Sequence, residues 1–483
     1  MKQQLAILAA ALAAANLFGA IRAVTPTAWN GDPNCWQMKR HHEKMSSVTN
    51  GGAKVVFIGD SITHFWETNG KEQWKKFFAD GPLKALDLGT SADRTEHVLW
   101  RLTEGKELDG YEAKCVFLMI GTNNTGHFPF EEEPPVDTIL GIREILKTIR
   151  AKQPNAKIVL TAIFPRGADA NDGRRHRNEV VNREIQKFAD GRTLIWCDFN
   201  DQFLTTDGVL PRGVMPDLLH PGPYGYEVWA SAVLPYATAA ISDAPMPPNR
   251  FAPFVRRESV RVDEPVTVYP ETRFEVGWWA ERELEKRNEI AASGGTFDIV
   301  LFGDSITHNW DRENRGRQAL DKLRETYSVL NIGFSGDRTE HLVWRGLNGD
   351  LDGYRAKCIM LMIGTNNTWH RKDPPALIAA GIRRVLDVIA IKQPQSKVLL
   401  LPIFPFGDGP QHKNRVNNEA VNALIRPYAD GRNVIWVDFN AKFLDEKGDT
   451  VKWMPDRCHP NAAGYSEVWL PSVLPYFKTI VGK

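Results

Sequence analysis

The chain contains two copies of one sequence block, and this duplication constrains its fold more than any other feature. Four motifs recur in the same order in both halves: GDSITH at 59–64 and 303–308, DRTEH-x-x-WR at 93–101 and 337–345, MIGTNN at 119–124 and 362–367, and MPD-x-x-HP at 215–221 and 454–460. The spacing between paired motifs stays between 239 and 244 positions. Solenoid repeats recur every ~20–50 residues, so the pattern excludes a solenoid and indicates tandem duplication of a whole domain.

The duplication and the flanking segments predict the domain organisation. We expect a secretory signal peptide at 1–23, because Lys2 precedes an apolar run that is too short to span a bilayer. A buried N-terminal helix is the alternative interpretation of this segment. The first domain is expected at 24–243, a Pro-rich linker at 244–272 and the second domain at 273–483. The signal peptide predicts an exported protein, periplasmic or secreted, and no other stretch predicts a membrane span.

Composition narrows the class of protein further. Lys and Arg total 60 and Asp and Glu total 59, and the sequence shows no basic stripe, which argues against a nucleic-acid-binding protein. The five Cys are scattered and form no CxxC pair, so a disulfide framework and a zinc ribbon are excluded. A hydrophobic content of 42% with 25% charged residues is that of a soluble globular protein. The oligomeric state stays open.

Short, nearly continuous apolar runs alternate with helical patterns in each copy. Such runs are typical of parallel strands buried on both faces. The predicted strands are Val55–Ile58, Ala85–Leu88, Cys115–Ile120, Ile158–Ile163 and Leu194–Cys197, then Ile299–Phe302, Val329–Ile332, Cys358–Ile363, Val398–Leu401 and Val434–Val437. The alternation predicts an α/β fold: two tandem three-layer α/β/α sandwiches, each with a central parallel sheet. In such a fold the ligand site lies at the carboxyl ends of the strands.

Polar motifs follow the first three predicted strands of each copy, so their side chains are expected to meet at that edge. Ser61 follows the first strand and opens a helix, while Asp217 and His220 lie near the end of the copy. A Ser hydroxyl becomes a nucleophile when a His base, oriented by a carboxylate, takes its proton. Asn123 and the loop at 89–93 offer N–H donors to an oxyanion. The second copy repeats the set as Ser305, Asp456, His459, Asn366 and the loop at 333–337.

Each motif alone has a simpler interpretation as a helix cap, a turn or a loop, but all four occur in order and twice. The set resembles the SGNH (GDSL) hydrolase family, most closely its platelet-activating-factor-acetylhydrolase-like branch, over almost all of both copies. The resemblance implies flavodoxin-like domains that cleave esters without a metal or an organic cofactor. It implies nucleophiles Ser61 and Ser305, bases His220 and His459, orienting carboxylates Asp217 and Asp456, and oxyanion donors Asn123, Asn366, Ala92 and Gly336.

Two features distinguish the copies. Where the second copy has Gly336, the first has Ala92, and a left-handed conformation costs Ala roughly 1–2 kcal/mol. A loop that moved to avoid this strain would displace its amide, so we expect the second site to be the more active on a small ester. His127 and His370 each lie four residues after the oxyanion Asn, where contact with substrate and a purely structural loop role are both open.

These observations predict an exported serine esterase that removes acetyl or other short acyl groups, with one site in each copy. The substrate expected is an acylated carbohydrate or another small ester. One alternative is an acetylhydrolase acting on a lipid or other small molecule. Another is a glycan-binding protein whose triads are relics, although the presence of Ser, Asn, Asp and His in both copies argues against it.

Overall fold

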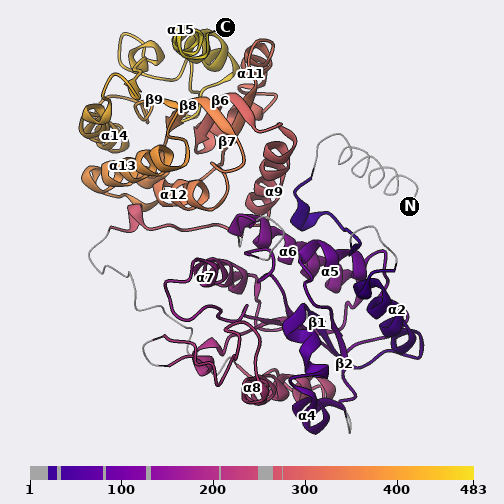
Figure 1. Ribbon diagram of the computed structural model, residues 1–483. Helices are drawn as coiled ribbons and strands as arrows, with labels where there is room; N and C mark the ends of the chain where they lie inside the picture. Colours follow the sequence, from indigo (N-terminus) through magenta and orange to yellow (C-terminus); the bar gives the residue numbers. More distant parts are fainter. Residues whose placement is uncertain are drawn as a thin grey trace. The chain divides into compact units, whose positions relative to one another are not determined.

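The computed structural model describes residues 20–29, 34–79, 83–126, 132–205, 208–248, 265–274 and 276–482 (Figure 1). Two compact units divide the chain, the first within Ile21–Ser259 and the second within Val260–Lys483. The boundary between the units falls inside the predicted linker, 244–272. Most of the predicted signal peptide, residues 1–19, lies outside the described residues.

A five-stranded parallel sheet in the order β2-β1-β3-β4-β5 forms the centre of the first unit. Its strands are β1 (Val55–Gly59), β2 (Leu86–Gly89), β3 (Cys115–Met119), β4 (Lys157–Thr161) and β5 (Leu194–Cys197). The chain passes from β1 to β2 on one side of β1 and then returns to β3 on the other side. This reversal is the switch point at which flavodoxin-like sheets place their ligand sites.

The second unit repeats the sheet in the same order, β7-β6-β8-β9-β10. Its strands are β6 (Thr296–Gly303), β7 (Val329–Gly333), β8 (Arg355–Met362), β9 (Lys397–Leu400) and β10 (Val434–Trp436). All ten predicted strands are present, with ends that differ by a few residues. The predicted fold of two tandem α/β domains with central parallel sheets is therefore confirmed.

Helices cover the sheets in both units (Figure 1). Those of the first unit are α2 (Trp36–Thr49), α3 (Ser61–His64), α4 (Lys71–Trp74), α5 (Thr95–Leu102), α6 (Pro135–Lys152), α7 (Gly173–Ile185) and α8 (Pro223–Ile241). Those of the second are α9 (Gly277–Ala292), α10 (Ser305–His308), α11 (Arg317–Arg324), α12 (Thr339–Asn348), α13 (Pro375–Lys392), α14 (Lys413–Ile425) and α15 (Leu470–Val481). None of the described helices is both long and apolar enough to cross a membrane.

An aromatic core joins the first sheet to α8. Phe57 and Phe117, on the neighbouring strands β1 and β3, stack with their ring centroids 4.6 Å apart. Trp229 of α8 packs against Trp66 at 4.8 Å, and both indoles are buried. Large buried aromatic side chains stabilise such a core by area and by edge-to-face contacts. This core lies under α3, which begins with Ser61.

A short segment before each sheet packs on the helices of its own unit. In the first unit η1 (Arg22–Val24) lies on α5 and α6, with Ala23 fully buried. The carbonyl oxygen of Ala23 approaches Gly141 so closely that a Cβ there would come within 2.7 Å of it. The second unit repeats this contact between η7 (Val266–Val268) and Gly381, also at 2.7 Å. The end of the predicted signal peptide, 21–23, is thus part of the packing of the first unit.

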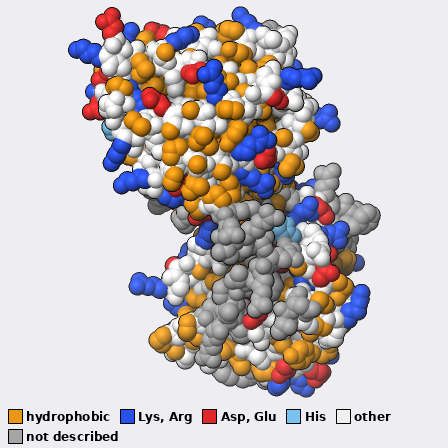
Figure 2. Space-filling view, turned by 90° about the vertical axis from the view of Figure 1, so that its left-hand side faces the viewer, with side chains coloured by type: hydrophobic (Ala, Val, Ile, Leu, Met, Phe, Trp, Pro, Cys, Tyr) orange, Lys and Arg blue, Asp and Glu red, His pale blue; other side chains and the backbone are white. Residues whose placement is uncertain are grey.

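Charges of both signs are interspersed over the described surface that Figure 2 shows. This distribution accords with the near-equal totals of 60 basic and 59 acidic residues. It offers no extended field of one sign on that face for a polyanion such as nucleic acid.

Candidate active site

The predicted nucleophile of the first unit stands at the carboxyl end of β1. Ser61 is the first residue of α3, and the helix is capped by Asp60, whose Oδ1 accepts a hydrogen bond from the Ile62 amide at 2.9 Å. The Ser61 Oγ lies 2.8 Å from Nε2 of His220. Nδ1 of His220 lies 2.6 Å from Oδ2 of Asp217. The structure therefore brings these three predicted residues together as a continuous Ser–His–Asp hydrogen-bond chain.

The Asp217–His220 pair is held by a tight turn. Oδ1 of Asp217 accepts the amides of His220 at 2.7 Å and Leu219 at 3.0 Å. Leu218, inside the turn, has φ 63, a left-handed conformation that is strained for a branched side chain. Partial burial opposes ionisation of Asp217, but the hydrogen bonds from His220 outweigh it and lower the pKa of the carboxyl. A carboxylate held ionised in this way suits the task of orienting an imidazole.

The second unit contains the same chain of contacts with one addition. Ser305 Oγ lies 2.8 Å from Nε2 of His459, and Nδ1 of His459 lies 3.1 Å from Oδ2 of Asp456. The same Oδ2 also accepts a hydrogen bond from Nη2 of Arg315 at 3.2 Å. In the first unit the side chain of Asn69 donates to the carbonyl of Pro221, as Arg315 does to the carbonyl of Pro460, but no such bond to Asp217 is present among the described residues. Oδ2 of Asp456 therefore contacts both the imidazole of His459 and the guanidinium of Arg315.

Arg315 was not singled out from the sequence. The available signal was the loop between GDSITH and α11, which is two residues longer than its counterpart before α4 and rich in Arg.

The predicted oxyanion donors occupy the loops after β2 and β3 and their counterparts. One N–H of the Asn123 side chain donates to the carbonyl of Asp93 at 2.8 Å, and Asn366 makes the same bond to Asp337 at 2.8 Å. Each amide group is thereby fixed, and in the described part of the chain its other N–H donates to no protein acceptor.

The two loops share one backbone conformation despite the Ala–Gly difference. Ala92 has φ 68 and Gly336 has φ 80. Among the described residues, neither backbone amide donates to a protein acceptor. Ala92 therefore adopts the left-handed conformation, and no difference in φ indicates that its loop is displaced. The displacement of the amide, which was the reason to expect a less active first site, is not observed.

Burial shifts the pKa of two further side chains of the GDSITH motif in each copy. The carboxyl of Asp60 is fully buried, which raises its pKa to about 7, and Asp304 shows the same effect. His64 and His308, three residues after each Ser, have pKa values lowered to about 4 and about 3, chiefly by burial. Both imidazoles are therefore neutral at physiological pH. Clustered pKa shifts of this kind are typical of functional sites.

The two tentative substrate contacts have different outcomes. His127 lies outside the described residues. His370 is exposed in η9 (Asn367–Arg371), with its ring 4.9 Å from that of Trp369. Partial removal of the imidazole from water, followed by the charges of Arg338 and Arg273, lowers the pKa of His370.

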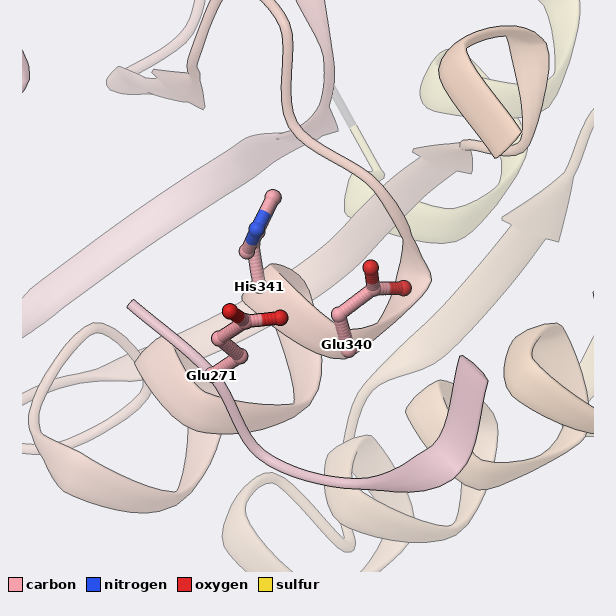
Figure 3. A group of neighbouring side chains, drawn as sticks. All are labelled: Glu271, Glu340 and His341. Carbon is pink, nitrogen blue, oxygen red and sulfur yellow. The ribbon is translucent and has the colours of Figure 1, made fainter. Parts of the chain in front are cut away.

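Glu271, Glu340 and His341 form a group of possible metal ligands in the described part of the chain (Figure 3). Their ligand atoms lie within 4.8 Å of one another. However, the carboxylate of Glu340 accepts hydrogen bonds from Nε of Arg338 at 2.5 Å and from Nη1 of Arg371 at 2.6 Å. Nδ1 of His341 accepts the Arg338 amide at 2.9 Å. The two guanidinium groups already neutralise the carboxylate of Glu340, and Nδ1 of His341 already accepts a backbone N–H, so the group is an ion-pair cluster and a poor cation site.

One known protein family matches both of the segments that contain these sites. The sequence profile of the GDSL-like lipase/acylhydrolase family matches residues 57–228 and 301–466. The chain belongs to this family. Each GDSL-like segment contains one of the Ser–His–Asp hydrogen-bond chains, so membership is established for both halves.

Several known proteins are similar to this chain in sequence or in structure. The human platelet-activating factor acetylhydrolase IB subunit alpha1 is 33% identical over 190 residues, which cover 39% of this chain and 77% of the relative. A putative acylhydrolase from Bacteroides fragilis is similar in structure, with 17% identity, 43% of this chain and 98% of that chain covered, and a TM-score of 0.36. Axe2, an acetylxylan esterase from Geobacillus stearothermophilus, has 19% identity, coverage of 39% and 96%, and a TM-score of 0.31.

Proposed function

We propose that this GDSL-family acylhydrolase is an exported serine esterase with two active sites, which removes acetyl or other short acyl groups from carbohydrate. The observation that carries the proposal is the hydrogen-bond chain Ser61–His220–Asp217, with contacts of 2.8 and 2.6 Å, and its repetition at Ser305. Such a chain has the geometry that general-base activation of a hydroxyl requires.

The proposed reaction at the first site uses only groups of this chain. His220 Nε2 takes the proton of Ser61 as its Oγ attacks the acyl carbonyl carbon. The resulting oxyanion accepts hydrogen bonds from the free N–H of Asn123 and from the amides of Ser61 and Ala92. The protonated imidazole, stabilised by Asp217, then passes its proton to the departing alcohol oxygen. Water, deprotonated by His220, hydrolyses the acyl-enzyme and releases the acid.

The second site is proposed to act in the same way through Ser305, His459 and Asp456. Asn366 and the amide of Gly336 take the places of the oxyanion donors. Repetition of the full set in a diverged copy supports two working sites over a glycan-binding protein with relic triads.

The substrate class rests on several supports. The relatives are named as acetylhydrolases, which favours acetyl as the acyl group. The side chains of Asp217 and Asp456 are 56% and 41% exposed, so water reaches the carboxylate end of each hydrogen-bond chain. A polar, hydrated surface beside the triad fits an acylated carbohydrate better than a long acyl chain, which requires apolar cover. Export, expected from residues 1–23, would place the enzyme with extracellular or periplasmic glycans.

An acetyl-lipid is the second candidate substrate, favoured by the 33% identity to the acetylhydrolase subunit named for platelet-activating factor. Acetate release from acetylated xylan, triacetin and an acetylated ether phospholipid would separate the candidates. We expect the wild type to hydrolyse triacetin and acetylated xylan and the Ser61→Ala/Ser305→Ala double variant to hydrolyse neither. Failure of the wild type to release acetate from any of the three esters would overturn the proposal, and preference for the phospholipid would replace carbohydrate with lipid.

A further inference from the structure

Two tryptophans remain exposed at equivalent positions of the two copies. Trp36 begins α2 and Trp278 lies in the first turn of α9, with 47% and 44% of their surfaces exposed. Their equivalence follows from the residue four positions on, because Arg40 Nε and Arg282 Nε donate to the carbonyls of Gly89 and Gly333, each at 2.7 Å. Other large exposed hydrophobic side chains of the described residues have no such counterpart in the other copy.

Each tryptophan lies against the histidine that ends the GDSITH motif. The ring centroids of Trp36 and His64 are 5.9 Å apart with planes inclined by 23°, and those of Trp278 and His308 are 6.1 Å apart and inclined by 34°. The neutral imidazole covers part of one indole face. The exposed fraction shows that much of the remaining ring is open to water.

These histidines connect the tryptophans to the oxyanion loops. Nδ1 of His64 is hydrogen-bonded to Oγ of Ser91 at 2.8 Å, and Nδ1 of His308 to Oγ of Ser335 at 2.9 Å. Ser91 directly precedes Ala92, and Ser335 directly precedes Gly336. The exposed indole is therefore one side chain away from the loop whose amide is proposed to bind the oxyanion.

A single exposed hydrophobic side chain is ordinary on a protein surface. An exposed indole at the equivalent position of both copies, one side chain away from the oxyanion loop, points to a shared role in binding. The face of an aromatic ring carries negative charge density, to which the C–H groups on one face of a pyranose or furanose ring are attracted. A pocket that pairs an aromatic wall with a few polar groups is typical of small-molecule recognition.

We propose that Trp36 and Trp278 are platforms on which a sugar ring of the acylated substrate stacks, one for each site. The proposal rests on the proposed esterase function and assigns its alcohol side to a carbohydrate. Stacking would hold the sugar so that its acyl group reaches the Ser61 or Ser305 hydroxyl. In the second site the guanidinium of Arg273 also lies 5.7 Å from the centre of the Trp278 ring, leaving that ring 44% exposed.

The test compares two kinds of acetyl ester in single-site backgrounds. Trp36→Ala and Trp36→Phe are made in the Ser305→Ala chain, and Trp278→Ala and Trp278→Phe in the Ser61→Ala chain. Acetate release is measured on acetylated xylo-oligosaccharides and on triacetin, a polyol ester without a ring. Ile391→Ala, which removes a side chain 67% exposed on α13, serves as the matched surface control.

We expect each Trp→Ala change to lower kcat/KM on the acetylated sugars about 10-fold, mainly through KM, as loss of ~1.4 kcal/mol of stacking predicts. Activity on triacetin should stay within twofold, Phe should restore most of the loss, and Ile391→Ala should change neither substrate. An equal loss on both substrates, or no loss on the sugars, would overturn the platform. A wild type active on triacetin but on no acetylated sugar would also overturn it, whereas a wild type inactive on every ester would overturn the esterase proposal itself.

Discussion

The reciprocal exchange Ala92→Gly and Gly336→Ala tests how the two oxyanion loops are held. Ala92 has φ 68, a conformation that costs an L-residue about 1–2 kcal/mol. Glycine removes this strain but costs about 0.4–1 kcal/mol through the greater freedom of the unfolded chain. The net gain for Ala92→Gly is therefore about 0.8 kcal/mol, equivalent to a rise in Tm of about 2 °C for a domain of this size.

The reverse change should cost more than the forward change gains. Gly336→Ala places an L-residue at φ 80, and its Cβ would come within 2.6 Å of Nη1 of Arg273. That guanidinium must move, breaking its 2.7 Å hydrogen bond to the carbonyl of Ser335, worth about 1 kcal/mol. With the strain of about 0.8 kcal/mol net, Gly336→Ala should destabilise the second unit by about 2 kcal/mol.

The assay joins thermal denaturation to kinetics on p-nitrophenyl acetate. In the Ser305→Ala background, Ala92→Gly should raise Tm and leave kcat/KM within threefold, because the amide is already in place. Loss or gain of one oxyanion donor changes kcat by about 10²–10³-fold. A rise in kcat/KM of tenfold or more would show that Ala92 holds its amide away from the oxyanion. An unchanged or lower Tm would refute the argument from strain.

Three further outcomes follow from individual contacts. In the Ser305→Ala background, Asp217→Asn should lower kcat on triacetin by ~10²-fold or more, since the imidazole loses its charged partner, and a loss below threefold would contradict this role. Burial beside Asp350 raises the pKa of Glu283 well above 4.5, so the folded chain keeps a proton that the unfolded chain loses, and the second unit should lose stability as pH rises above 4.5. In urea unfolding at several pH values, the free energy of unfolding should depend less on pH for Glu283→Gln than for the wild type, and an equally steep dependence would refute this prediction. A chain beginning at Val24 should melt about 5 °C or more below one beginning at Ile21, because Ile21 is only 4% exposed and burying such a side chain stabilises the fold by about 1.5–3 kcal/mol. Equal melting temperatures would show that η1 contributes nothing to the stability of the first unit.

The fold could be predicted from the sequence because two patterns that determine it, the apolar runs and the repeated motifs, are visible along the chain. Uninterrupted apolar runs such as Cys115–Ile120 identify strands buried on both faces, and the repeated motifs identify two domains. The strand order 2-1-3-4-5 adds what no single run contains, namely which strand ends are neighbours. That order explains why motifs far apart in sequence meet at the ends of β1 and β3.

The candidate site was predictable only where residue types recur in motifs. Ser61, Asp217 and His220 were found because their chemistry requires those side chains in combination. Arg315 was missed, since its bond to Asp456 depends on the path of a loop that differs in length between the copies.

Backbone angles and ion pairs are equally invisible in the sequence. The φ of Ala92 lies in the left-handed region, which an Ala residue in the sequence does not indicate. Arg371 pairs with Asp373 and Glu340, and no motif or spacing in the sequence indicates either partner. The sequence therefore does not predict which charged side chains pair with one another in the folded chain.

The central claim is that the chain carries two serine nucleophiles, one in each copy. The most direct measurement is the intact mass of the protein after reaction with an organophosphonate that phosphonylates activated serines. We expect two adducts on the wild type, one on Ser61→Ala, one on Ser305→Ala and none on the double variant. Adducts that persist on the double variant, or a wild type that stays unlabelled while p-nitrophenyl acetate is hydrolysed, would contradict it.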